Sequence, residues 1–459
     1  MIKKETVSNL SRRDFIKKTA SAALVLAAST YFTGCGTDDA DAFSGANFAV
    51  ISDPHVYDTR LGTYGAAWQK YLLSDRKLLA ESESILASAV DRILEAKPKV
   101  DFVIVAGDLT KDGEKQCHEL FASYMNRLIE NGIKVLVVPG NHDINNPHAM
   151  AFNAETPSPV PGVSPDEFKA IYNGMGFADA VLKDPASLSY IAEPVDDLWV
   201  FCLDSCKYES NYADDYPKTS GAFSDETLSW ILENIDYAKH HGKKVMGVAH
   251  HGIVEHFTGQ SQVPKLGDEY VVDNWKDVSE KLAKAGMGIV FTGHYHAQDI
   301  TKRTMDDGSF IFDVETGSLV TFPNPVRFVS ITNDFKEEIN SEFVNEIDYN
   351  TNGMTFPEYA KDFLVTGLTV QAPYYMTTGF GISQEKAAEM TPDVVKAFTS
   401  HYAGDEKPTL EDLGKVQSYM SDSNPTIAMM GGLLGALWTD LPPSDNFLAV
   451  NLNTGEVID

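Results

Sequence analysis

Short apolar runs alternate with longer amphipathic stretches over the first two thirds of the chain. The runs span residues 48–51, 102–105, 135–138, 199–203, 245–249, 289–291 and 310–312. Between the first of them, residues 83–96 and 116–130 carry the apolar spacing of helices. Apolar runs that alternate with helices predict an α/β domain whose strands are largely buried.

The pattern changes after residue 335, where strand-like runs become rare. Residues 356–364, 384–403 and 410–420 have helical spacing, and residues 447–452 are expected to form a closing strand. A proline-rich stretch over residues 146–165 predicts a long loop. We therefore expect one domain over residues 47–335 and a C-terminal, mostly helical extension over residues 336–459.

The N-terminal segment is expected to be a signal rather than a part of the fold. Residues 11–17 (Ser-Arg-Arg-Asp-Phe-Ile-Lys) match the twin-arginine pattern, and an apolar stretch follows over residues 19–33. That stretch is too short and too poor in Leu and Ile to predict a permanent membrane span. We assign residues 1–35 to an export signal and residues 36–46 to a linker, which predicts a periplasmic or membrane-anchored protein.

Cys35 stands at the end of the apolar stretch and is a candidate lipidation site. Residues 32–35 (Phe-Thr-Gly-Cys) resemble the lipobox of bacterial lipoproteins, in which the Cys is lipidated and becomes the mature N-terminus. The alternative is cleavage after Ala42, in the small-residue sequence Ala-Asp-Ala, which would release a soluble protein. We favour lipidation because this otherwise unneeded Cys directly follows the apolar run.

Composition adds limits on partners. Hydrophobic residues make up 43% of the chain, which is ordinary for a globular protein and argues against wholesale disorder. The formal net charge of −29 would repel phosphate backbones, so nucleic-acid binding is not expected. Contact with a membrane is expected only through the lipid anchor, and no feature predicts an oligomeric state.

Five polar clusters follow five of the apolar runs directly. They are Asp53-Pro54-His55, Gly107-Asp108, Gly140-Asn141-His142-Asp143, His250-His251 and Gly293-His294-Tyr295-His296. Because ligand sites in α/β sheets lie beyond the carboxyl ends of the strands, we expect these clusters to meet in one crevice. Their glycines are expected to allow the sharp turns that point the neighbouring side chains back over the sheet.

The residue types in this crevice fit a pair of metal ions. Carboxylate oxygen, amide oxygen and imidazole suit Zn²⁺, Mn²⁺ or Fe, and the clusters contain no Cys for a thiolate site. Two cations roughly 3.5–4 Å apart, bridged by one Asp, would convert a bridging water into a hydroxide that attacks phosphorus. Each cluster alone would favour an ordinary turn, loop or exposed strand end, but all five in this order favour the metal pair.

The five clusters resemble the motif set of the calcineurin-like metallophosphoesterase superfamily: Asp-x-His, Gly-Asp, Gly-Asn-His-Asp, a His pair and Gly-His-x-His. The resemblance covers about residues 48–328 and implies a two-sheet sandwich flanked by helices. It implies two divalent or trivalent ions (Mn, Fe or Zn) held by Asp53, His55, Asp108, Asn141, His250, His294 and His296. Within that set, it assigns Asp53, His55 and His296 to one ion, Asn141, His250 and His294 to the other, and Asp108 to both.

The same resemblance implies that His142 protonates the leaving-group oxygen and that Asp143 and His251 support the ligands or face the substrate. Some relatives carry an Asp three residues after the bridging Asp to orient the catalytic His. Here that position is Lys111, with Asp112 beside it, so the group that orients His142 does not follow from the resemblance. Purple acid phosphatases carry a Tyr there, so no iron–tyrosinate centre is expected.

The resemblance predicts an exported hydrolase that cleaves phosphate esters by a metal-bridging hydroxide. The run Gly-Asp-Leu-Thr-Lys-Asp-Gly over residues 107–113, together with Asp143, favours the phosphodiesterase-leaning branch or a broad phosphatase. The alternative is a catalytically silent metal-binding scaffold of the same fold. Such scaffolds typically lose ligands or the acid His, whereas this chain keeps both.

Other histidines and cysteines are given structural interpretations. His148 and His256 are expected to belong to loop structure, with substrate contact as the less favoured alternative, and His401 is expected at the surface of the C-terminal extension. Cys202 is expected to be a small buried hydrophobe rather than a disulfide partner of Cys206.

Overall fold

A computed structural model describes residues 43–263 and 267–458 of the chain. The predicted export signal, Cys35 and the alternative cleavage site after Ala42 lie outside these residues, so the interpretations placed on them stay predictions. None of the described helices has the length and apolar character needed to cross a membrane.

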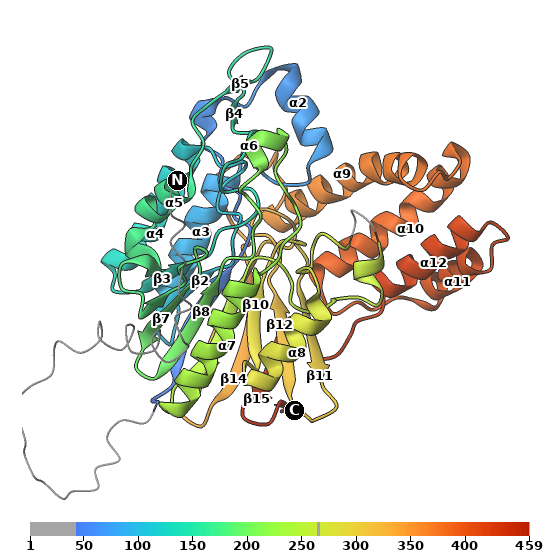
Figure 1. Ribbon diagram of the computed structural model, residues 1–459. Helices are drawn as coiled ribbons and strands as arrows, with labels where there is room; N and C mark the ends of the chain where they lie inside the picture. The colour runs from blue at the N-terminus through green and yellow to red at the C-terminus, as the bar shows by residue number, and fades with distance from the viewer. Residues whose placement is uncertain (1–42, 264–266, 459) are drawn as a thin grey trace, which may run out of the picture. The chain divides into compact units, whose positions relative to one another are not determined.

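Two seven-stranded mixed sheets form the centre of the described structure (Figure 1). The first contains, in order, β16 (Glu456–Val457), β15 (Phe447–Asn451), β14 (Lys336–Phe343), β13 (Pro325–Ile331), β1 (Ala46–Ile51), β2 (Phe102–Val105) and β3 (Lys134–Val137). The second contains β11 (Asp299–Thr304), β12 (Phe310–Glu315), β10 (Ile289–Thr292), β9 (Lys244–Ala249), β8 (Leu198–Leu203), β7 (Tyr190–Val195) and β6 (Leu182–Lys183). All seven predicted strands of residues 48–312 are therefore confirmed.

Parallel pairing brings the carboxyl ends of the central strands to common edges. In the first sheet β1 and β3 both run parallel to β2, and Val105 pairs with Ile51 and with Val137. In the second sheet β9 runs parallel to β8 and β10. The polar clusters that follow these strands consequently leave each sheet at one edge, as predicted.

The apolar faces of the two sheets share one core. Phe48 of β1 stacks on Phe102 of β2 with ring centroids 4.7 Å apart and meets Phe291 of the second sheet edge-on at 5.5 Å. All three side chains are buried, and burial of such aromatic surface is a principal stabilising term.

Helices cover the outer faces of both sheets. On the first sheet lie α3 (Ser82–Glu95) and α4 (Lys115–Glu130), and on the second lie α7 (Asp225–His240) and α8 (Trp275–Ala285) (Figure 1). The predicted helices over residues 83–96 and 116–130 are confirmed as α3 and α4. The fold is thus α/β, with two sheets flanked by helices, as the sequence predicts.

Shorter helices and strands lie within the loops. They are η1 (Thr59–Leu61), α2 (Gly65–Ser74), β4 (Met150–Ala151), β5 (Ser158–Pro159), α5 (Pro165–Ile171), η2 (Asn173–Phe177), α6 (Asn211–Asp214) and η3 (Gln260–Gln262). The proline-rich stretch after residue 146 contains only the two-residue strands β4 and β5 before α5 begins.

Four helices form the C-terminal region with a core of its own. They are α9 (Phe356–Thr378), α10 (Gln384–Ala403), α11 (Leu410–Met420) and α12 (Pro425–Leu437). Leu364, Met390 and Leu434 belong to their shared apolar cluster. The predicted α10 and α11 are confirmed, whereas α9 extends beyond residue 364 and α12 was not predicted.

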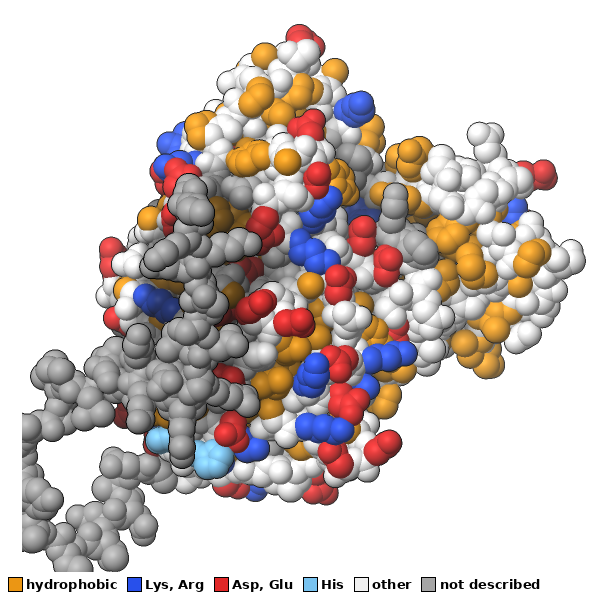
Figure 2. All heavy atoms as spheres, viewed as in Figure 1, with side chains coloured by type: hydrophobic (Ala, Val, Ile, Leu, Met, Phe, Trp, Pro, Cys, Tyr) orange, Lys and Arg blue, Asp and Glu red, His pale blue; other side chains and the backbone are white. Residues whose placement is uncertain are grey.

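The chain returns from these helices to the first sheet, because β15 pairs with β14. The helices are therefore an insertion between two neighbouring strands, and the domain boundary after residue 335 stays a prediction. On the face seen in Figure 2, acidic and basic side chains intermingle over the α7 and α8 side, while apolar side chains are exposed over the C-terminal helices. Exposed apolar residues of this region include Val370, Leu413 and Met429.

Candidate metal centre

Five candidate ligands lie in loops with unusual backbone conformation. The residues with positive φ are Asp53 (49°), His55 (37°), Asp108 (48°), His294 (76°) and His296 (69°). Such φ values are costly for residues other than Gly and persist where the surrounding structure fixes them. Backbone hydrogen bonds do so here, since the Asp53 and His55 amides donate to the carbonyls of Gly107 (3.1 Å) and Asp108 (2.9 Å).

Glycines next to the ligands act in two different ways. Gly107 has φ +89°, which fits the sharp turn predicted for it. Gly140 and Gly293 do not have positive φ, so a left-handed backbone conformation does not explain why glycine stands there. A Cβ on Gly140 would collide with Asp108, and one on Gly293 would collide with the side chains of Ser52 and Asp53. These two glycines are required for close approach.

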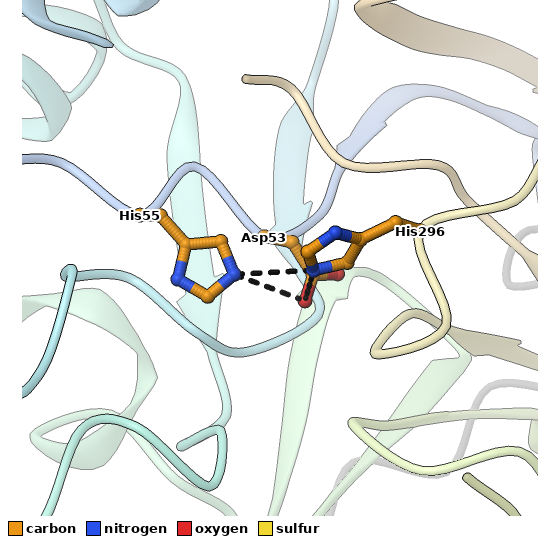
Figure 3. A group of neighbouring side chains, drawn as sticks. All are labelled: Asp53, His55 and His296. Atoms are coloured by element: carbon orange, nitrogen blue, oxygen red, sulfur yellow. Dashed lines mark hydrogen bonds and ion pairs between the residues drawn. The ribbon is translucent and has the colours of Figure 1, made fainter. Parts of the chain in front are cut away.

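Asp53, His55 and His296 form the first candidate metal group (Figure 3). The Asp53 Oδ1 atom lies 3.8 Å from His55 Nε2 and 3.3 Å from His296 Nε2. The two imidazole nitrogens are 3.2 Å apart. Three ligand atoms from the loops after β1 and β10 therefore converge on one point.

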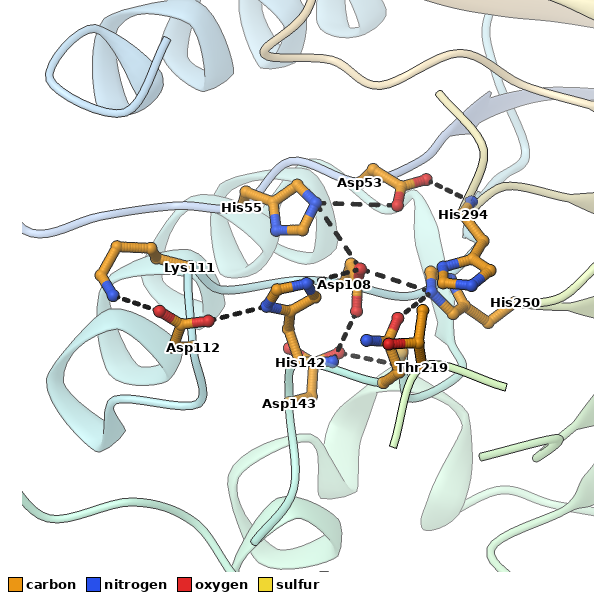
Figure 4. A network of polar contacts seen from close by, with 12 residues as sticks. Asp53, His55, Asp108, Lys111, Asp112, His142, Asp143, Thr219, His250 and His294 are labelled. Atoms are coloured by element: carbon orange, nitrogen blue, oxygen red, sulfur yellow. Dashed lines mark hydrogen bonds and ion pairs between the residues drawn. The ribbon is translucent and has the colours of Figure 1, made fainter. Parts of the chain in front are cut away.

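Asp108, His250 and His294 form the second candidate group, with Asn141 beside it. The Asn141 Oδ1 atom lies 3.2 Å from His250 Nε2. The Asp108 Oδ2 atom lies 3.4 Å from His250 Nε2 and 3.5 Å from His55 Nε2, so one carboxylate oxygen reaches both groups (Figure 4). All seven predicted ligand residues are thus assembled in one site.

Hydrogen bonds to backbone carbonyls orient the imidazoles. His250 Nδ1 donates to Ala106 (2.8 Å), His55 Nδ1 to Thr110 (3.3 Å) and His294 Nε2 to Glu269 (3.2 Å). In a neutral ring the other nitrogen then carries a lone pair, and it points at carboxylate or amide oxygens that also lack a proton. This arrangement of an outer carbonyl, an imidazole and a facing ligand position is typical of metal-binding His.

The charges of the centre fit cations as well. Burial lowers the pKa values of His55 and His294, which favours the neutral imidazole that a metal ligand requires. Burial would also lower the pKa of His250, but Asp108 and Asp53 raise it to about 9, so this ring must release a proton when it binds a metal. Burial alone would raise the pKa of Asp108, but neighbouring His250 and His142 lower it well below its usual value. The buried Asp53 Oδ1 has no hydrogen-bond partner among the described residues. An unpartnered buried carboxylate oxygen is costly unless a cation neutralises it, so the residues present fit a metal pair.

His142 is oriented by Asp112. Its Nδ1 donates to Asp112 Oδ1 at 2.8 Å, which leaves Nε2 facing Asp108 Oδ2 at 3.9 Å. Asp112 is in turn fixed by the buried Lys111, whose Nζ lies 2.5 Å from its other oxygen and 2.9 Å from Glu114. The structure thus identifies the orienting group that the motif comparison left open, displaced by one residue along the loop.

The pKa values of this chain of contacts agree with that arrangement. Burial and Lys77 lower the pKa of His142, but Asp108 and Asp112 outweigh them and raise it above its usual value. Burial would raise the pKa of Asp112, yet Lys111 and His142 lower it, so Asp112 is ionised. An ionised Asp112 is the state that accepts the His142 hydrogen bond.

Asp143 holds the loops together. It is fully buried and accepts hydrogen bonds from the backbone amides of Gly140 (2.8 Å), Leu109 (3.1 Å) and Thr110 (3.1 Å). Burial and the nearby Asp108 raise its pKa to about 7. These contacts tie the loop after β3 to the loop after β2, which positions ligands of both.

His251 has both ring nitrogens engaged away from the ligand groups. Its Nε2 donates to the Thr219 carbonyl at 2.8 Å, and its Nδ1 lies 2.7 Å from the Ser205 hydroxyl. Burial and the adjacent His250 lower its pKa to about 3, so the ring is neutral. These contacts fit support of the neighbouring ligand, one of the two roles that the sequence left open.

A cavity of about 360 Å³ opens over the candidate ligands. Its walls include six residues outside the sequence motifs: Arg76, Lys77, Tyr216, Tyr270, Gln371 and Tyr375. Tyr295 of the last motif and His148 also line it. Gln371 and Tyr375 belong to α9, so the C-terminal region contributes directly to the site. Their spacing is that of an ordinary helix, which is why they could not be recognised as site residues from the sequence.

A family model described as calcineurin-like phosphoesterase matches residues 46–298. This match spans more than half of the chain, and the chain belongs to that family. Within the matched residues lie all seven candidate ligands and His142. No curated protein sequence matches the chain.

Several solved structures resemble this fold. A dimetal phosphatase from Danio rerio is 14% identical, with 66% of this chain and 97% of that chain covered and a TM-score of 0.45. A sulfate thiohydrolase from Thermus thermophilus is 13% identical, with 72% of this chain and 61% of that chain covered and a TM-score of 0.34. A purple acid phosphatase from yellow lupin (Lupinus luteus) is 10% identical, with 68% of this chain and 53% of that chain covered and a TM-score of 0.39.

Proposed function

We propose that this protein is an exported phosphoric ester hydrolase that uses two metal ions. The observation that carries the proposal is the position of Asp108 Oδ2, 3.5 Å from His55 Nε2 and 3.4 Å from His250 Nε2. A single carboxylate oxygen between two convergent ligand groups is the geometry that a bridged metal pair requires. Its membership of the calcineurin-like phosphoesterase family supports the reaction class.

Each ion would have its own ligands in this proposal. Asp53, His55 and His296 would hold one ion, and Asn141, His250 and His294 would hold the other. The oxygen and imidazole donors suit Mn, Fe or Zn. When bound, such a pair supplies charge stabilisation to the phosphoryl group and generates a nucleophile from water.

The residues of the chain supply the remaining steps. Asp112 fixes the His142 ring through Nδ1, so that Nε2 can donate a proton to the leaving-group oxygen as the ester bond breaks. Buried Lys111 keeps Asp112 ionised and in place. Arg76 and Lys77 border the same cavity together with Asp75, which pairs with Lys77 at 3.2 Å, so these three groups carry a net positive charge that favours an anionic substrate there.

More specifically, we propose that the protein is a phosphodiesterase or a broad phosphatase. The support for this proposal is the loop sequence over residues 107–113 together with Asp143. The alternative function, a silent metal-binding scaffold, is disfavoured because His142 is oriented towards the metal groups by a buried acid–base chain. A scaffold that does not catalyse does not need these contacts among Lys111, Asp112 and His142.

Turnover under defined metals tests the proposal. Full-length protein, stripped and reloaded with Mn²⁺, Fe or Zn²⁺, would be assayed on p-nitrophenyl phosphate and bis-p-nitrophenyl phosphate, with Asp108→Asn as the control for contaminating activity. We expect metal-dependent release of nitrophenolate from the diester at least, and none from the control. Metal binding without turnover on either substrate would favour the scaffold instead.

Export by the twin-arginine route, with lipidation at Cys35, is part of the same proposal. Its support is the sequence of residues 11–17 and the placement of Cys35 after the apolar run. Because this route carries folded proteins, ions could be bound before export. Cys35→Ala should lose the membrane anchor, as judged by fractionation and mobility. Unchanged behaviour of that variant would favour cleavage after Ala42.

A further inference from the structure

A second, apolar cavity of about 150 Å³ adjoins the cavity over the metal centre. The residues that line both are Arg76, Tyr270, Tyr295, Gln371 and Tyr375. A larger hollow beside α2 shares only His148 with the metal-centre cavity. Continuity therefore favours the apolar cavity as the extension of the site.

The walls of this second cavity come from the C-terminal helices. Beyond the shared residues they include Met376 of α9, Phe380 just after that helix, Val394 and Phe398 of α10, and Met430 of α12. Such a lining favours an apolar group over water, because water needs several polar partners. A cavity of about 150 Å³ with apolar walls is large enough for one benzene ring.

Arg76 stands where the two cavities meet. Its guanidinium donates to the Gln371 side-chain oxygen at 3.1 Å, and the Gln371 amide donates to the Leu73 carbonyl at 3.3 Å. Gln371 holds the guanidinium without neutralising it, while the adjacent Asp75 carboxylate, which pairs with Lys77 at 3.2 Å, offsets part of its charge. The junction is suited to an anionic head group on one side and an apolar group on the other.

We propose that the substrate is a phosphate ester with an aryl or similarly compact apolar group that occupies the cavity lined by α9, α10 and α12. The phosphate would face the metal centre and pass close to Arg76. This inference rests on the proposed function, because the phosphate is placed by the metal pair. The C-terminal helices then serve as the part of the chain that selects the organic group.

A pair of phosphonates tests the inference without turnover. Metal-loaded, full-length protein would be titrated calorimetrically with phenylphosphonate and with methylphosphonate, which share the anionic head and differ in the apolar group. Burial of one aromatic ring should make the phenyl compound bind about 10- to 100-fold more tightly. Equal affinities would overturn the cavity proposal and leave the proposed function standing. Absence of binding by both would overturn both.

Filling the cavity provides the matched variants. Ala372 lines only the apolar cavity, so Ala372→Phe should abolish the preference for phenylphosphonate and leave the affinity for methylphosphonate unchanged. Val370→Phe adds the same ring on the exposed side of α9 and should keep the preference. If Ala372→Phe does not fold, Val394→Phe fills the cavity from α10 instead. A folded filling variant that keeps the wild-type preference would contradict the proposal.

Discussion

The metal-centre loops and the C-terminal helices bury opposite kinds of side chain. The loops bury charged and polar side chains such as Asp53, Asp108 and Lys111, and each is held by hydrogen bonds, ion pairs or a facing ligand position. The C-terminal helices bury apolar side chains and leave a cavity between them. The first region can position reacting atoms, because polar contacts have strict geometry. The second can select a shape, because apolar contacts are non-directional.

This difference implies a division of labour within one site. Changes in the loops should act on the chemical step, whereas changes at the cavity should act on substrate binding. Mutant kinetics separate the two, since loss of uniform binding raises KM and loss of transition-state interactions lowers kcat.

Asp108→Asn should have the largest effect. The amide cannot supply the anionic oxygen that lies between His55 and His250, so both ligand groups lose their shared partner. We expect kcat to fall by at least about 10⁴-fold. This loss would equal or exceed the largest effect expected from removing the general acid, because both ions lose a ligand. Turnover and metal content should be measured on the same sample. Two tightly held ions in this variant would contradict the bridging role.

His142→Ala should retain its metals but turn over on the order of 10²–10⁴-fold more slowly. The defect should be smaller for nitrophenolate than for alkoxide leaving groups, because a good leaving group needs little protonation. An equal loss for both leaving groups would exclude His142 as the acid.

Asp112→Asn tests the orientation of His142 separately. The variant keeps the size of the side chain but removes the charge that the His142 Nδ1 proton and Lys111 contact. We expect kcat to fall by a large part of the His142→Ala effect. Metal content should be unchanged. Wild-type kcat in a folded Asp112→Asn variant would show that another group orients His142.

Arg76→Gln should weaken substrate binding and leave the chemical step largely unchanged. A hydrogen bond to a charged group is worth about 1.5–3 kcal/mol, so KM should rise by about 10-fold or more while kcat changes little. Arg127→Gln, on the exposed face of α4, is the control and should change neither constant. A fall in kcat with constant KM would place Arg76 in the chemical step and break the division of labour.

Glu337→Gln should change stability without changing either kinetic constant. Both Glu337 carboxylate oxygens are buried without a hydrogen-bond partner among the described residues, and burial raises the pKa from 4.5 to about 8. Because the folded pKa exceeds the unfolded one, wild-type stability falls as pH rises from about 4.5 to 8. The variant removes this fall, so its gain in Tm should be larger at pH 9 than at pH 5.

The neighbouring Glu338→Gln is the control for that measurement. Glu338 is exposed on the same strand, β14, and its replacement should shift Tm equally at both pH values. An equal shift for Glu337→Gln would show that its carboxyl group does not titrate with a raised pKa.

The polar loops could be predicted from sequence because each ligand directly follows an apolar strand. Asp53, Asp108 and His250 are recognisable one motif at a time, and parallel pairing then brings the motifs together. The orienting role of Asp112 was not predictable, because the family pattern places that group one position earlier, at Lys111. Only the fold shows that Lys111 turns away to pair with Asp112 and Glu114.

The apolar cavity could not be predicted, because its residues carry no motif. Tyr270, Gln371 and Phe398 are far apart in sequence and resemble ordinary helix or loop positions. Helix α12 was missed because its sequence is apolar on all sides and contains Gly431, Gly432 and Gly435, which lower helix propensity.

The burial of two histidines was not predicted, for a related reason. His256 lies in the loop between β9 and η3, as predicted, but its burial was not foreseen: it donates to Asp299 at 2.7 Å and lies 3.4 Å from Glu315. His401 was placed at the surface but is buried beside Glu406. In both cases the carboxylate partner that makes burial tolerable lies outside any local motif. Cys202 is buried and free, as predicted, and Cys206 is also free and buried.

Metal stoichiometry tests the central claim most directly. Full-length protein would be saturated in turn with Mn²⁺, Fe and Zn²⁺, freed of loose ions by gel filtration and analysed by mass spectrometry for metal per chain. The proposed bridged centre predicts two ions per chain with at least one of these metals. A ceiling of one ion per chain, or none, with all three would contradict it.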